Sequence, residues 1–142
     1  MKGKILVTIQ FTCLVLLMIV TNWLVLPWWS FLLLGISGFL AFWSMAVMKL
    51  GNFNIVPYPV VNGNLVTLGP YSVIRHPMYT SIFIFAIALL SGQFDFRKLI
   101  ISLVLVAGLI LKMIYEEGLL CSHFPDYKAY MRKTKGVVPF IW

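Results

Sequence analysis

The sequence predicts an all-α integral membrane protein with about four transmembrane helices. Hydrophobic residues make up 61% of the 142 residues and charged residues only 11%, whereas soluble domains are about half apolar and about a quarter charged. The mean hydropathy is +0.97, and a soluble core in so short a chain could not bury that much apolar surface. Two cysteines do not indicate a disulfide framework. The length predicts one domain over residues 1–142.

The first two spans are predicted to form a helical hairpin over residues 1–48. Residues 5–26 form an apolar run that is long enough to cross a bilayer, for which about 20 residues are needed. Pro27 ends this run, and residues 28–48 form the second span, which begins with two tryptophans typical of the membrane interface. Because the first run is long and no cleavage site of small residues follows it, we expect a retained helix rather than a signal peptide.

Two shorter spans follow, at residues 77–93 and 99–115. The third span begins with proline, which is favourable as the first residue of a helix, and the segment GQFDFRK separates it from the fourth. A polar loop at 49–76 precedes these two helices, and a polar tail at 116–142 follows them. Since the tail mixes leucines and aromatic residues with lysines and arginines, we expect it to form a helix at the membrane interface, as a lid or as a surface anchor.

The basic residues predict on which side of the membrane each polar segment lies. With the N-terminus inside, most lysines and arginines are cytoplasmic, and only Arg97 and Lys98 are outside. Both termini, the loop 49–76 and the tail 116–142 are then cytoplasmic, and we expect a multi-pass protein of a prokaryotic inner membrane. The net charge of +7 reflects this topology rather than nucleic-acid binding, because no basic stripe with interleaved aromatic residues is present.

Charged residues near two predicted helix ends are candidates for a binding site. Arg75 and His76 stand directly before the third span, where unpaired N–H groups already carry partial positive charge. Glu116 and Glu117 stand at the predicted end of the fourth span, where the helix dipole disfavours them, and Lys112 lies on the same helical face. One zwitterionic ligand between the two groups would explain both placements. The alternative is a solvated interfacial cluster in which Lys112 extends towards water.

Other kinds of site find little support in the sequence. Cys121 and His123 lack a second pair of ligands at zinc spacing, so we expect no metal site. No nucleophile-elbow glycine pattern is present, and neither a Walker-type nor a GxGxxG loop occurs. The loop 49–76 contains Asn-Gly and Gly-Pro turn signals. Its segment NLVTLG could lay extended backbone beside a flat ring, or could be an ordinary interfacial loop.

Two motifs of the chain resemble those of a known family of membrane enzymes. They are LVTLGPYSVIRHPMYTS, from residue 65, and EEGLLCSHFPDYKAY, from residue 116. Together they are similar to the isoprenylcysteine carboxyl methyltransferase family, whose wider relatives include phospholipid methyltransferases. The resemblance covers residues 49 to about 135, and it depends on the combined spacing of the motifs.

The resemblance implies S-adenosylmethionine as the cofactor and transfer of its methyl group to a lipophilic small molecule or lipidated acceptor in contact with membrane lipids. The acceptor group could be a carboxylate, an amine or a thiol. The loop and the interfacial tail would form the cofactor pocket. The residues that the resemblance implies for cofactor binding are Leu65, Val66, Tyr71, His76, Tyr79, Glu116 and Glu117. The candidate catalytic residues are Arg75, Lys112 and Glu116, with Lys112 near the methyl acceptor.

The chain departs from the family pattern at two positions, and two other functions stay open. Ser81 stands where many members have glycine, and Gly136 stands where many bacterial members have arginine. The C-terminal pattern also resembles membrane sterol reductases, but the phosphates of NADPH should call for more basic residues around the loop than Arg75 alone. The remaining alternative is a non-catalytic membrane protein on the same scaffold.

Overall fold

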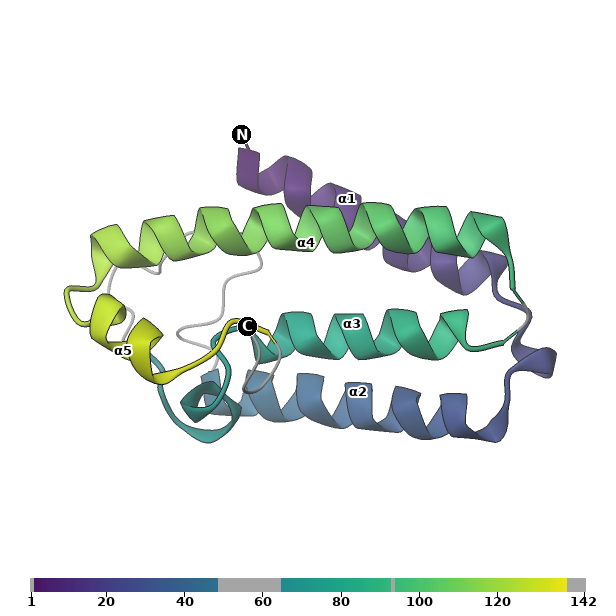
Figure 1. Ribbon diagram of the computed structural model, residues 1–142, viewed down its shortest axis with the longest axis horizontal. Coiled ribbons are helices and arrows are strands. Elements are labelled where there is room, and N and C mark those ends of the chain that lie inside the picture. The colour runs from purple at the N-terminus through teal and green to yellow at the C-terminus, as the bar shows by residue number, and fades with distance from the viewer. Residues whose placement is uncertain (1, 49–64, 93, 138–142) are drawn as a thin grey trace.

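The computed structural model describes residues 2–48, 65–92 and 94–137. All regular elements in this part of the chain are helices, and no strand occurs in it (Figure 1). Two short 3-10 helices, η1 (Trp23–Val25) and η2 (Gly69–Ser72), lie in the connections. The five α-helices of the described residues are α1 (Lys2–Val20), α2 (Trp28–Met48), α3 (Pro77–Leu90), α4 (Phe96–His123) and α5 (Tyr127–Lys133). The predicted all-α class is confirmed.

Three of these helices, α1, α2 and α4, are long and apolar enough to cross a membrane. The third predicted span, at residues 77–93, is only partly met, because α3 has 14 residues. At 1.5 Å per residue such a helix covers about 21 Å, against a hydrocarbon core of about 30 Å. Membrane-spanning character is therefore assigned to three helices, and the expected count of four is not confirmed.

Two helix boundaries differ from the sequence prediction. The first helix ends at Val20 rather than near residue 26, because Asn22 caps the short η1 helix by accepting a hydrogen bond from the Leu24 N–H. The fourth helix continues through both glutamates to His123. The expectation that the Glu116–Glu117 pair stands at the end of this helix is therefore wrong. Glutamate and leucine are good helix formers, which favours the continuation.

The helices pack as two antiparallel pairs, α1 along α4 and α2 along α3, and α3 also contacts α4 (Figure 1). The start of α3, the end of α4 and α5 lie together at one end of the bundle, which we call the loop end. The opposite end, which we call the turn end, holds the connections from α1 to α2 and from α3 to α4. The two polar segments predicted to assemble a site thus share the loop end in their described parts.

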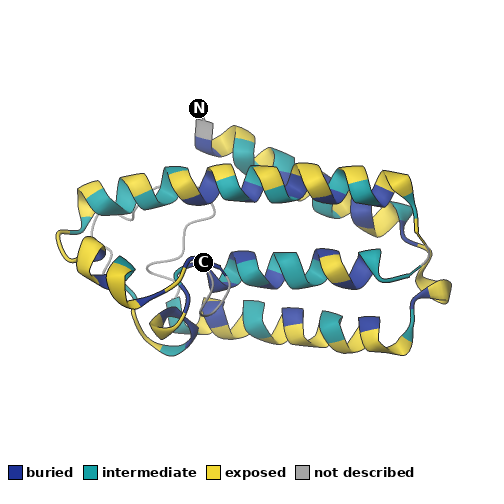
Figure 2. Ribbon diagram, viewed as in Figure 1, coloured by how far each residue is buried: buried dark blue, intermediate teal, exposed yellow. Residues whose placement is uncertain are grey.

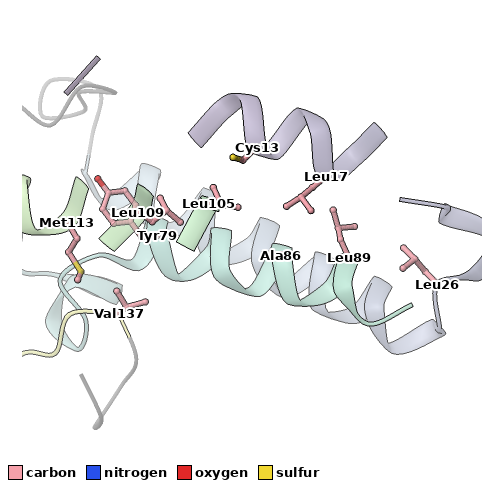
Figure 3. Packing of buried hydrophobic residues seen from close by; sticks show 10 residues of the cluster. All are labelled: Cys13, Leu17, Leu26, Tyr79, Ala86, Leu89, Leu105, Leu109, Met113 and Val137. Atoms are coloured by element: carbon pink, nitrogen blue, oxygen red, sulfur yellow. The ribbon is translucent and has the colours of Figure 1, made fainter. Parts of the chain in front are cut away.

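The core lies between α1, α3 and α4, and large apolar side chains cover much of the outer surface. Leu17, Leu89, Leu105 and Leu109 are almost completely buried in one cluster (Figure 3). On α2 the buried positions are serines at a spacing of seven residues, including Ser37, whose hydroxyl donates to the Ser81 carbonyl on α3 at 2.8 Å. Such small residues let membrane helices approach closely. The outward faces are exposed and apolar (Figure 2), as expected for a surface in contact with lipid.

Candidate functional site

The tail holds the segment before α3 in place. Ile74 forms an isolated parallel bridge with Lys135. The Arg75 N–H donates to the Lys135 carbonyl at 2.7 Å, and the His76 N–H donates to the Gly136 carbonyl at 3.0 Å. The backbone donors of Arg75 and His76 are thus already paired within the chain. The expected anionic ligand at this point is not needed to satisfy them.

Arg75 and His76 meet one of the two glutamates directly. The Arg75 Nε lies 2.7 Å from the Glu117 Oε1, and the His76 Nε2 lies 3.1 Å from the same oxygen. One Arg75 terminal nitrogen also donates to the carbonyls of Met131 and Thr134, at 3.2 and 2.5 Å. Arg75 therefore joins the segment before α3 to α4 and to the end of α5. Its role in the structure is to fix these three elements relative to one another.

Tyr79 connects the second glutamate to the histidine. Its hydroxyl donates to the Glu116 Oε2 at 2.5 Å. Its ring stacks on the His76 imidazole, with ring centroids 5.1 Å apart and an angle of 1° between the ring planes. His76 and Tyr79 face each other because His76 is the N-cap of α3 and Tyr79 lies in its first turn. A carboxylate, an imidazole and a phenol therefore adjoin one another at the start of α3.

Lys112, on α4, lies next to this group and also contacts α1. Its ammonium nitrogen is 5.1 Å from the centre of the Tyr79 ring, and it donates to the Gln10 Oε1 at 2.8 Å. Gln10 did not emerge from the sequence as a candidate. The available signal was a glutamine side chain within a run of mostly apolar residues, which is a costly placement in a membrane.

The remaining predicted residues lie in the loop before α3. Tyr71 is buried in η2, its hydroxyl contacts the Met48 sulfur at 4.0 Å, and its carbonyl accepts from the Tyr130 hydroxyl at 2.6 Å. Leu65 and Val66 are half-buried just before η2, and their predicted role in cofactor binding stays a prediction. The Asn-Gly turn and the rest of the loop, residues 49–64, lie outside the described residues.

The tyrosines around the cluster are kept neutral. Burial raises the pKa of Tyr71 above its usual range, and burial likewise raises the pKa of Tyr130 to about 12. Such phenols donate hydrogen bonds at neutral pH and do not serve as bases. The groups with a charge to offer are therefore the two glutamates, Arg75, Lys112 and, when protonated, His76.

The structure brings together six of the predicted site residues. Part of their charge is paired directly within the chain, whereas the sequence analysis expects a ligand between the two groups. The six are Arg75, His76, Tyr79, Lys112, Glu116 and Glu117. Glu117 is paired directly with Arg75 and His76, so a ligand is not required to explain that half of the cluster. Glu116 and Lys112 have only neutral hydrogen-bond partners in the described contacts, Tyr79 and Gln10. Glu116 and Lys112 are therefore the charged groups that a ligand could still pair with.

No group of three histidine, cysteine, aspartate or glutamate side chains that could hold a metal ion occurs among the described residues. Cys121 contacts the Met131 sulfur at 3.7 Å, and His123 is exposed at the end of α4.

Comparison with known proteins identifies relatives of this chain. The "Protein-S-isoprenylcysteine O-methyltransferase" of Schizosaccharomyces pombe is 39% identical over 80 residues, which are 54% of this chain and 34% of that protein. The "Nickel-cobalt-cadmium resistance protein NccN" of Alcaligenes xylosoxydans is 35% identical over 77 residues, which are 53% of this chain and 36% of that protein. This chain thus matches about a third of the length of each of these curated relatives. No solved structure matches it significantly.

The family comparison covers more of the chain. The sequence model of the family described as phospholipid methyltransferase matches residues 25–126, a stretch that runs from the end of η1 to the residue before α5 and includes Arg75, His76, Tyr79 and both glutamates. Because this match extends over well over half of the sequence, the chain belongs to the phospholipid methyltransferase family of membrane methyltransferases.

Proposed function

We propose that the chain transfers a methyl group from S-adenosylmethionine to a lipophilic acceptor at the loop end of the bundle. The observation that carries this proposal is the meeting of Glu116, Tyr79, His76 and Lys112 where α3 begins beside α4. The family membership indicates methyl transfer, and the resemblance of the two motifs indicates the methyl donor.

The chemistry of these side chains fits such a donor. S-adenosylmethionine supplies an electrophilic methyl group on a sulfonium cation. Carboxylates and aromatic faces are the groups that stabilise a cation in a partly buried site, and Glu116 with the stacked rings of His76 and Tyr79 offers both. The side chains of Arg75 and Glu117 keep 13% and 17% of their surface exposed, so the cluster is not fully buried on their side.

In this proposal the residues divide into two groups. Arg75 and Glu117 hold α3, α4 and α5 in register through their ion pair and the carbonyl contacts of Arg75. Tyr79 orients Glu116 by donating to one of its carboxylate oxygens. Lys112, which is 5% exposed, presents an ammonium group from the apolar side and orients the acceptor. Correct alignment of donor and acceptor in a water-poor site can supply about 7–11 kcal/mol.

The acceptor determines whether a base is required. A carboxylate acceptor is already ionised at neutral pH and needs only orientation, for which Lys112 is suited. An amine or thiol acceptor must lose a proton, and His76 or a glutamate is then the candidate base. We further propose that the loop end faces the cytoplasm of a prokaryotic cell, that both termini lie on that side, and that the acceptor arrives from the membrane lipids.

Ligand binding to the detergent-purified protein tests the proposal. We expect calorimetry to show binding of S-adenosylhomocysteine and no binding of NADPH. His76→Ala and Glu116→Ala should each weaken S-adenosylhomocysteine binding while the helical circular dichroism signal is retained. Binding of NADPH alone would favour a reductase, and binding of neither compound would favour a non-catalytic membrane protein. Unchanged affinity in both variants would refute the assignment of the site.

Methyl transfer is then measured with radiolabelled S-adenosylmethionine and two acceptor preparations, a total lipid extract in mixed micelles and a peptide ending in an S-isoprenylated cysteine. The second preparation is chosen because of the name of the Schizosaccharomyces pombe relative. We expect label in at least one of the two preparations. Label in neither, with cofactor binding intact, would contradict a lipophilic acceptor of these two classes.

A further inference from the structure

Gln10 is a buried polar residue in the apolar helix α1. It is 9% exposed, and its Oε1 accepts a hydrogen bond from the ammonium nitrogen of Lys112 at 2.8 Å. The two residues are 102 positions apart in the chain, on helices that pack along each other. Since a polar side chain inside a membrane helix is costly, its presence needs a reason beyond packing.

The partner that Gln10 provides is neutral. Within the described part of the chain the ion pairs join Arg75 and His76 to Glu117, and Arg97 to Asp95, and none includes Lys112. A buried ammonium without a counter-ion is unfavourable. A glutamate in place of Gln10 would relieve that cost by forming an ion pair. The glutamine instead satisfies one donor of the ammonium group and adds no charge, so the negative group that acts on Lys112 is Glu116, which lies one turn along α4 and forms no direct ion pair with it among the described residues.

The contact also fixes where the ammonium group lies. A lysine side chain is a flexible four-carbon stem that readily extends towards water at the end of a membrane helix. Lys112 instead lies over the Tyr79 ring, at 5.1 Å, and Tyr79 in turn donates to Glu116. Gln10 is the side chain that holds the ammonium group in this position from the opposite helix.

We propose that Gln10 is a positioning residue of the methyl-transfer site, which holds the Lys112 ammonium group over Tyr79 without neutralising it. This inference rests on the proposed function. Gln10 lies before residue 25, where the family match begins, so α1 adds to the site a residue that the shared family segment does not contain. The side of the site that faces the acceptor is then built by α1 together with α4.

Two substitutions of Gln10 separate positioning from packing. Gln10→Leu removes the acceptor of the Lys112 hydrogen bond and keeps the volume of the side chain. Gln10→Glu keeps an acceptor oxygen at the same place and adds a negative charge. The matched control is Thr8→Val, because Thr8 is an exposed polar residue of the same helix whose hydroxyl bonds only within α1, to the Lys4 carbonyl at 3.1 Å.

Turnover is measured with radiolabelled S-adenosylmethionine and the total lipid extract or prenylated peptide, whichever the wild-type protein methylates. We expect Gln10→Leu and Gln10→Glu each to lower the rate about tenfold or more at low acceptor concentration, with S-adenosylhomocysteine affinity within about twofold of wild type. Gln10→Glu should retain or increase the melting temperature, because it pairs the buried ammonium group. In a Lys112→Met background, Gln10→Leu should cause no further loss.

Three results would overturn this inference while leaving the proposed function intact. They are a Gln10→Leu rate equal to that of Thr8→Val, a Gln10→Glu rate at or above wild type, and additive effects of Gln10→Leu and Lys112→Met. A wild-type protein that neither binds S-adenosylhomocysteine nor transfers methyl groups would instead overturn the proposed function, and with it any part of Gln10 in the reaction.

A readout without turnover tests the contact itself. The rate at which an amine-reactive acylating reagent modifies Lys112, followed by mass spectrometry, should rise several-fold in Gln10→Leu and stay unchanged in Thr8→Val, because the freed ammonium group can leave its buried position. An unchanged labelling rate in Gln10→Leu would show that Gln10 does not hold Lys112, whatever the activity of the protein.

Discussion

Two lysines of α4, Lys98 and Lys112, are almost equally buried, with 4% and 5% of their surface exposed, but their partners differ in kind. At the turn end, the Lys98 ammonium nitrogen donates to the Leu89 carbonyl at 3.0 Å. Leu89 is in the last turn of α3, where unpaired carbonyl groups carry partial negative charge and attract a cation. The end of a neighbouring helix therefore provides a partner for the buried charge of Lys98.

No helix end accounts for Lys112 in the same way. Its partners are side chains, the Gln10 amide on α1 and the Tyr79 ring on α3. The charged pairs near the two lysines differ as well, since Asp95 at the turn end pairs with Arg97, two residues away, whereas Arg75 at the loop end pairs with Glu117, 42 residues away. A buried cation that no backbone feature explains is the one to assign to function.

Replacing each lysine by methionine should give the largest difference. Lys112→Met removes the charge that orients the acceptor, and we expect at least a 100-fold loss of methyl transfer, or about 2.7 kcal/mol. Affinity for S-adenosylhomocysteine should stay within about threefold. Lys98→Met should keep the activity per folded molecule but lose about 1–3 kcal/mol of stability, because the Leu89 carbonyl loses its donor.

The two measurements are methyl transfer per mole of folded protein and the thermal unfolding midpoint in detergent. Equal losses of activity in the two lysine variants would mean that both residues serve only to hold the helices together, and the contrast between the two ends of the bundle would have no functional meaning.

The adjacent glutamates offer a second matched pair within the loop end. Glu116→Gln keeps an oxygen for the Tyr79 hydroxyl but removes the charge next to the proposed sulfonium position, so S-adenosylmethionine should bind about tenfold more weakly, or about 1.4 kcal/mol. Glu117→Gln should instead lower stability by about 1 kcal/mol, because Arg75 exchanges a charged acceptor for a neutral one. Calorimetry and thermal unfolding distinguish the two. The assignment fails if Glu117→Gln weakens binding more than Glu116→Gln does.

The sequence predicted the helical class and the convergence of its two motifs, because both follow from local patterns. Apolar runs bounded by proline and tryptophan locate α2 closely, and the charges of Arg75 and Glu117 indicated that two distant segments meet. The end of α4 was not predicted, because the apolar run alone ends the fourth span before Glu116 and Glu117. Their partners, Tyr79 and Arg75, are supplied by tertiary contacts that make the longer helix favourable.

Gln10 shows where reasoning from the sequence stops. Its partner is 102 residues away, and nothing in a pattern read along the chain connects the first helix to the fourth. The direct pairing of Arg75 with Glu117 was not predicted, because the sequence analysis places a ligand between these charges. The sequence shows that charges are placed at a cost, but only the packing of α1, α3 and α4 shows which side chain relieves each cost.

The stability of the loop end should fall at high pH, because Tyr130 then loses its hydroxyl proton. Its hydroxyl donates to the Tyr71 carbonyl at 2.6 Å, and burial raises the pKa of Tyr130 from 10.0 to about 12. The folded protein therefore holds this proton more tightly than the unfolded chain. The resulting stabilisation of the folded state is fully present below pH 10 and is lost as the pH rises towards 12. Tyr130→Phe should start about 1 kcal/mol less stable and show a smaller loss between pH 10 and pH 12.

The stability of the turn end should depend on pH in the opposite direction, through Asp95. This is the smallest effect that we predict. Hydrogen bonds from the Arg97 side chain and backbone hold the pKa of Asp95 below its usual value of 3.8. Its contribution to stability is therefore present above about pH 4 and is lost as the pH falls through the lowered pKa. Asp95→Asn keeps a side chain that can cap α4 but cannot titrate. Thermal unfolding of this variant should change less than that of wild type between pH 5 and pH 3. Identical slopes would show that the Asp95 carboxylate adds nothing to the stability of the turn end, which would then rest on its uncharged contacts and on Lys98.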